Sequence, residues 1–164
     1  PVELTAYLQQ HYTSADDVPL LFWVGYAWGS AINVSRDDPE MILDLATARA
    51  IIEHVVSLDP TYFHFAGVIF LGVVNAAMPE ALGGNPERGR EYFEQALEGT
   101  HRQFFSVQLN YAKAYAIATG DRALFISLLR EVIDGGDLDP GSRLANRLAR
   151  RRAIRLLSRV DEFF

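Results

Sequence analysis

The sequence contains no cysteine, so disulfide bonds and thiolate metal sites are excluded. Its longest apolar runs, residues 20–34 and 63–78, are interrupted by Gly, Ser, Asn or His. These runs are too short and too broken to predict a membrane span. With 49% hydrophobic and 22% charged residues in 164, the chain is expected to form a single folded domain, residues 1–164, with a buried core.

Signals of catalysis and of metal binding are also missing. The four histidines, at positions 11, 54, 64 and 101, do not share the helical spacing with a carboxylate that zinc sites use. Gly83-Gly84 does not follow a strand and has no lysine of a phosphate-binding loop, so it is read as a turn. We therefore expect no enzyme activity, no metal and no cofactor.

Positive charge is scarce except at one end of the chain. Residues 1–142 contain eight Lys or Arg against nineteen Asp or Glu, whereas residues 143–159 contain seven Arg and no acid. The overall net charge of -6 argues against general nucleic-acid binding, because a phosphate backbone requires a positive field.

Four Asp-Pro or Asn-Pro pairs mark helix starts, at positions 38, 59, 85 and 139. The side-chain oxygen caps the first turn, and the φ of the following proline is already set for a helix. With the three- and four-residue spacing of apolar side chains, they predict an all-α protein. The expected helices span residues 2–12, 20–34 (opened by Val18-Pro19), 39–58, 62–78, 87–97, 101 or 102–119, 122–133 and 140–160.

Pairs of these helices fit the tetratricopeptide repeat, which has a period of about 34 residues and small residues where helices touch. Gly72, Gly89, Phe93 and Ala96 match that pattern well. The prediction is a stack of antiparallel helix pairs, as degenerate tetratricopeptide-like repeats, closed by a C-terminal Arg-rich capping helix.

An ordered set of short strings carries a resemblance to a known family. The strings are Trp28-Gly29-Ser30-Ala31-Ile32, Arg36-Asp37-Asp38-Pro39-Glu40, Ser57-Leu58-Asp59-Pro60-Thr61-Tyr62, Phe70-Leu71-Gly72, Gly83-Gly84-Asn85-Pro86-Glu87-Arg88, Tyr92-Phe93-Glu94-Gln95-Ala96-Leu97, Gly120-Asp121-Arg122 and Leu144-Ala145-Asn146-Arg147-Leu148-Ala149. Over residues 18–164 the sequence resembles the T component of tetratricopeptide-associated TRAP (tripartite ATP-independent periplasmic) transporters.

The resemblance implies a periplasmic, usually lipid-anchored protein that partners the solute-binding P component and often forms a homo-oligomer, a trimer. It also implies a hydrophobic pore or cleft for an apolar ligand or an organic acid, and no catalysis. The chain begins at Pro1 without a lipoprotein signal. We therefore expect it to be the larger, C-terminal part of a longer precursor.

A concave groove lined by the first helix of each pair is the expected ligand site. The residues predicted to line it are Trp23, Tyr26, Ser30, Asn33, Ile69, Val73 and Asn110. Aromatic rings with a polar group suit an apolar ligand that has one polar end. The alternative is that the aromatic side chains are core. Asn75, the polar side chain within residues 65–78, either binds ligand or caps a loop carbonyl, and we favour the structural role.

Arginines recur every four residues from Arg143 to Arg159, so neighbours share a helix face. The functional interpretation is that Arg147, Arg151 and Arg155 dock an acidic partner, or that the arginines bind a carboxylate. The alternative, which we favour, is that the arginines pair with carboxylates of the preceding helices and cap the stack.

Two functions fit these observations. The first is a transport accessory that binds a hydrophobic or amphipathic small molecule and docks on a solute-binding protein. The second is a general scaffold that binds a peptide in its concave face.

Overall fold

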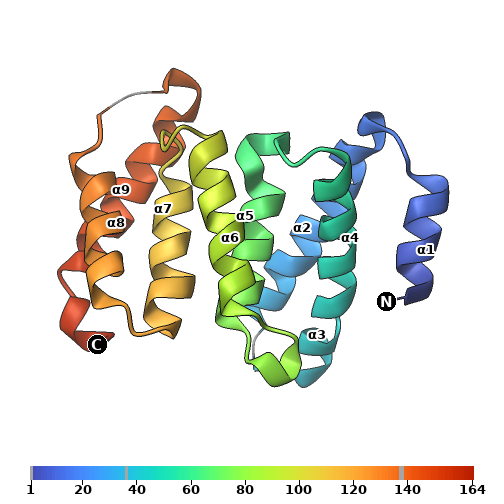
Figure 1. Cartoon of the computed structure of the whole chain (residues 1–164), viewed down its shortest axis with the longest axis horizontal. Helices are drawn as coiled ribbons and strands as arrows, with labels where there is room; N and C mark the ends of the chain where they lie inside the picture. Colours follow the sequence, from blue (N-terminus) through green and yellow to red (C-terminus); the bar gives the residue numbers. More distant parts are fainter. Residues whose placement is uncertain (1, 36, 137–138) are drawn as a thin grey trace. The chain divides into compact units, whose positions relative to one another are not determined.

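The computed structural model describes residues 2–35, 37–136 and 139–164, and Figure 1 shows its course. Those residues form helices joined by turns, with no strand among them. The all-α prediction is confirmed. None of the described helices combines the length and the apolar character that crossing a bilayer requires.

The chain divides into two compact units, residues 1–71 (unit 1) and 72–164 (unit 2). Unit 1 contains α1 (Val2–His11), the 3-10 turn η1 (Ala15–Asp17), α2 (Val18–Val34), α3 (Pro39–Leu43), α4 (Leu45–Leu58) and the first part of α5 (Tyr62–Ala77). Unit 2 contains the rest of α5, η2 (Glu80–Leu82), α6 (Pro86–Gly99), α7 (Ser106–Tyr111) with its π-helical continuation η3 (Ala112–Ala116), α8 (Arg122–Asp134), η4 (Pro140–Ser142), α9 (Arg143–Leu157) and η5 (Val160–Glu162).

The predicted caps form as the sequence indicates. The side-chain oxygens of Asp38, Asp59, Asn85 and Asp139 each accept a hydrogen bond from a main-chain N–H two or three residues later, at 2.8 to 3.0 Å. Each bond satisfies a donor that the first turn leaves unpaired. Gly120 takes the predicted left-handed conformation between η3 and α8, with φ of 70°.

The largest differences from the predicted helix boundaries occur in two places. The helix expected over residues 39–58 is divided at Asp44, which ends α3 and begins α4. The helix expected from residue 101 or 102 begins only at Ser106, because His101 and Arg102 adopt positive φ angles of 50° and 59°. The Asn146 side chain of α9 holds this turn by accepting from the N–H of Phe105 and donating to a neighbouring carbonyl.

Helix α5 starts with an unusual turn. Phe63, His64 and Phe65 all have left-handed φ angles, between 49° and 61°. This conformation costs an L residue about 1 to 2 kcal/mol, so the surrounding contacts must hold it. It turns the beginning of α5 toward α2 within unit 1, where Phe63 meets the aromatic residues of α2.

Small residues allow the helices of each unit to approach closely. In unit 1, a Cβ placed on Gly29 of α2 would lie 2.3 Å from Cε2 of Phe70 on α5. In unit 2, a Cβ on Gly72 would lie 3.1 Å from Cε1 of Phe93, which is fully buried. Glycine at these positions therefore leaves space for the two phenylalanine rings that a larger residue would displace.

Candidate functional site

Exposed aromatic rings gather where α2 passes the start of α5 in unit 1. We call Trp23, Tyr26 and Phe63 the aromatic face. Phe22, which is fully buried, lies beneath it, with its ring centroid 5.1 Å from those of Trp23 and Tyr26 and 5.8 Å from that of Phe63. Tyr62 packs edge-on against Phe22 at 5.2 Å. The face is therefore a layer built on a core ring.

The three rings keep much of their surface in solvent. Trp23 is 48% exposed, Tyr26 38% and Phe63 51%. The rings of Trp23 and Phe63 meet edge to face with centroids 5.2 Å apart, and those of Trp23 and Tyr26 are nearly perpendicular at 86°. Aromatic surfaces of this kind bind apolar groups by contact and cations through their negative ring faces.

The polar groups predicted on the same helix are also at the surface. Ser30 and Asn33 are exposed, and the Ser30 hydroxyl donates to the carbonyl of Tyr26 at 2.7 Å. Trp28, on another side of α2, is half-buried, with its indole N–H 3.3 Å from a carboxylate oxygen of Asp44. Among the aromatic residues of α2, Phe22 is fully buried, so the alternative that these side chains belong to the core holds for Phe22.

The other predicted ligand residues are in less accessible positions. Ile69 of unit 1 is buried. In unit 2, Val73 is half-buried, Asn75 is buried, and the Asn110 amide donates to the carbonyl of Ser106 at 2.8 Å. The burial of Asn75 favours the structural role. A ligand role for these four residues stays a prediction.

The predicted docking residues on α9 form what we call the arginine surface, comprising Arg147, Arg151 and Arg155. All three are exposed, and among the described residues no carboxylate pairs with them. The favoured pairing with carboxylates of the preceding helices is therefore absent at these positions. Arg150, in contrast, caps the end of α8 by donating to the carbonyls of Val132 and Gly135.

Large apolar side chains share the exposed side of α9. Leu144, Leu148 and Ile154 are exposed, whereas Ala149 and Ala153 are buried against the rest of unit 2. The helix thus packs through small residues and presents arginine and aliphatic side chains to solvent. Such a surface is typical of docking sites, where charge orients the partner and apolar contact contributes affinity.

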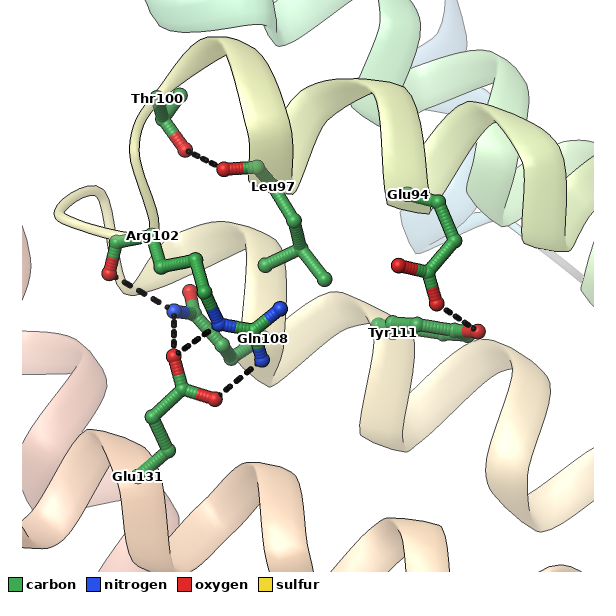
Figure 2. Close-up of polar contacts among 7 residues, drawn as sticks. All are labelled: Glu94, Leu97, Thr100, Arg102, Gln108, Tyr111 and Glu131. Carbon is green, nitrogen blue, oxygen red and sulfur yellow. Dashed lines mark hydrogen bonds and ion pairs between the residues drawn. The ribbon is translucent and has the colours of Figure 1, made fainter.

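A polar cluster in unit 2 has a structural role (Figure 2). Glu131 of α8 accepts from Arg102 Nε at 2.8 Å, from Arg102 Nη2 at 2.5 Å and from Gln108 Nε2 at 2.8 Å. Gln108 Nε2 also donates to the carbonyl of Arg102 at 2.9 Å. The bonded Glu131 carboxylate raises the pKa of Arg102. These bonds fix the left-handed turn before α7.

Beside this cluster, the hydroxyl of Tyr111 donates to Glu94 at 2.9 Å, as Figure 2 shows. The Tyr111 ring stacks on Phe93 with centroids 4.8 Å apart. Burial, and then the neighbouring Glu94 carboxylate, raise the pKa of Tyr111 well above its ordinary value. A phenol held neutral in this way stabilises the core and is unsuited to act as a base.

Two surface hollows accompany these features. One, of about 540 Å³, lies along α6 beside Glu87, Glu91, Glu94 and Glu98, and the other, of about 550 Å³, lies between α1 and α4. Within residues 2–35, 37–136 and 139–164, no group of three or more His, Asp or Glu is arranged to hold a metal ion.

Comparison with known proteins now decides the family. A protein-family model described as the TRAP transporter T-component matches residues 2–164. The chain belongs to this family. The resemblance found in the sequence is thereby confirmed, and the match includes α1, which the resemblance left out.

One relative of this T-component chain is a protein of Treponema pallidum (strain Nichols) described as uncharacterised. The two are 28% identical over 149 residues, which cover 90% of this chain and 46% of the relative. The chain thus spans about half the length of that relative.

Phe63 is the residue of the aromatic face that sequence reasoning missed. It belongs to the predicted helix 62–78, but its neighbourhood depends on the left-handed turn that starts α5. The local sequence does not predict that turn, because none of residues 63–65 is Gly, Asn or Asp, the residue types that commonly adopt the left-handed conformation.

Proposed function

We propose that this chain is a non-enzymatic accessory component of a periplasmic TRAP transport system. In this role it binds a hydrophobic or amphipathic small molecule and docks on the solute-binding P component. The family match over residues 2–164 supports the transport role. The observation that carries ligand binding is the aromatic face, where three rings remain exposed above a buried aromatic core.

The proposal includes a tetratricopeptide-like arrangement of helix pairs. Support comes from glycines at helix contacts in each unit: Gly25 of α2 against the isoleucines of α4, and Gly72 and Gly89 in the α5–α6 pair of unit 2. Tetratricopeptide helices touch at small residues of this kind. An array of such pairs presents its first helices to ligands.

Ligand binding is tested by native mass spectrometry of the purified protein and of two variants. We expect a co-purifying small molecule in the wild type, and its loss in Trp23→Ala, because that change removes an exposed ring from the site. Val34→Ala is the matched control, since Val34 is exposed on the same helix, at the end away from Trp23. Equal occupancy of the wild type and Trp23→Ala would contradict the assignment.

Docking is tested by pull-down with purified candidate solute-binding proteins. Reversing Arg147, Arg151 and Arg155 to Glu is expected to abolish capture, because the arginine surface would then repel an acidic partner. The control reverses Arg88, Arg90 and Arg130, which lie on α6 and α8 and change the net charge equally. If both triple variants lose capture to the same extent, capture depends on the net charge of the protein, and the arginine surface is not the docking site.

A further inference from the structure

The aromatic face stands in the part of the chain that has the greatest excess of negative charge. Residues 1–71 contain nine Asp or Glu and two Arg, Arg36 and Arg49. Arg49 is already paired with Glu53 at 2.8 Å, and Arg36 lies outside the described residues. Unit 1, which carries the aromatic face, therefore has a large excess of negative over positive charge.

Several of these carboxylates lie close along the chain to the rings. Asp16 and Asp17 precede α2, the helix that carries Trp23, and Asp59 precedes the left-handed turn that carries Phe63. The start of α2, the end of α4 and the start of α5 lie at the same end of unit 1 (Figure 1). Asp59 accepts from both the N–H and the hydroxyl of Thr61, which fixes its carboxylate beside the turn.

These observations select the charge of a ligand. A carboxylate at the rings would be repelled by the excess of acids in unit 1, and none of the described arginines of unit 1 is unpaired to attract it. An ammonium group would gain from the acids and from the negative faces of exposed aromatic rings, which attract cations within about 6 Å. Trp23, Tyr26 and Phe63 offer three such rings.

We propose that the aromatic face binds an amphipathic small molecule with a positively charged, ammonium-type head group, and that it discriminates against organic acids. This inference rests on the proposed ligand-binding function and assigns the charge of its ligand. The apolar part of the ligand lies on the rings, and the cationic head is held by ring faces and nearby carboxylates.

The test compares three probes with apolar chains of five or six carbons: hexyltrimethylammonium, hexanol and hexanoate. The protein has two tryptophans, so Trp28→Phe leaves Trp23 as the single fluorophore, at the centre of the face. Titration at low salt is expected to show hexyltrimethylammonium binding about tenfold more tightly than hexanoate, with hexanol between them. Added salt should narrow that ratio, because it screens exposed charges.

A second substitution assigns the preference to the rings. Phe63→Leu keeps an apolar side chain but removes one ring face, and it should reduce the advantage of the ammonium probe over hexanol by about 2- to 5-fold. Val34→Leu, at the other end of α2, is the control and should leave the ratio unchanged. Circular dichroism of each variant verifies that the helices are retained.

The outcomes separate this inference from the function on which it rests. Failure of all three probes to change Trp23 fluorescence would remove the proposed ligand-binding function itself. Hexanoate binding as tightly as the ammonium probe would overturn the charge assignment and leave ligand binding intact. A preference that Phe63→Leu leaves unchanged, or binding of a lysine-rich peptide without binding of the hexyl probes, would also overturn the inference.

Discussion

Replacing Glu131 should destabilise the protein more than replacing its buried partner Gln108. Gln108 is 0% exposed, and both hydrogen bonds of its amide come from Nε2, one to Glu131 and one to the carbonyl of Arg102. Among the described residues, no donor reaches Gln108 Oε1. The side chain is thus half satisfied, and Glu131 holds the charged half of the cluster.

The contacts give the magnitudes. Glu131→Ala removes a hydrogen bond between a buried amide and a carboxylate, worth about 1.5 to 3 kcal/mol. It also removes the Arg102 ion pair, which is partly exposed and worth about 0 to 1 kcal/mol. We expect Glu131→Ala to lower the free energy of unfolding by about 1.5 to 4 kcal/mol. Gln108→Met loses the same bond and the neutral bond to the Arg102 carbonyl, worth about 0.5 to 1.5 kcal/mol, but it also removes the unpaired oxygen, whose burial costs about 1 to 3 kcal/mol. The free energy of unfolding should therefore fall by only about 1 kcal/mol.

Urea unfolding followed by far-UV circular dichroism measures both changes. Glu98→Ala serves as the control, because Glu98 is an exposed acid of α6 and its loss should change stability by no more than about 0.5 kcal/mol. If Gln108→Met costs as much as Glu131→Ala, then Oε1 has a partner in solution and the reasoning from its burial is refuted.

Three further predictions concern packing, backbone and ionisation. Gly29→Ala should lower the free energy of unfolding by about 1 to 3 kcal/mol in the same assay, because the alanine Cβ would lie 2.3 Å from a ring atom of Phe70. An unchanged free energy of unfolding would show that the Phe70 ring moves aside freely. His101→Gly should stabilise the protein by about 1 kcal/mol, because glycine adopts the left-handed φ of 50° without strain. Gln95→Gly, in the middle of α6, should destabilise the protein by about as much. If both substitutions changed the free energy of unfolding in the same direction, this explanation would be wrong. Burial and a carboxylate raise the pKa of Tyr111 in the folded state, so the unfolded phenol ionises first and stability should fall as pH rises above about 10. The urea midpoint measured against pH should decline less steeply in Tyr111→Phe, and identical slopes would refute the assignment.

Local chemistry made most helix boundaries predictable. A capping oxygen followed by proline acts within one turn, so the starts marked by Asp38, Asn85 and Asp139 could be identified without knowledge of the fold. The left-handed turn at His101 and Arg102 could not, because it depends on Asn146, which lies more than forty residues later in the chain and bonds the following backbone. Tertiary contacts of that kind override local propensity.

The candidate sites divide in the same way. Arg147, Arg151 and Arg155 share a face by their spacing alone, but only the packed helix shows that its small residues are buried and its arginines exposed. Trp23 and Tyr26 were predicted as ligand residues from the pattern of α2, whereas the place of Phe63 beside them required the start of α5 to be known.

The sequence by itself therefore determined the helical class, the helix caps and the uneven distribution of charge along the chain, because these follow from the chemistry of neighbouring residues. The tertiary structure decided which rings are core and which remain in solvent, and which arginines find partners. Those outcomes depend on the side chains that distant segments bring to the same place, and no local pattern encodes them.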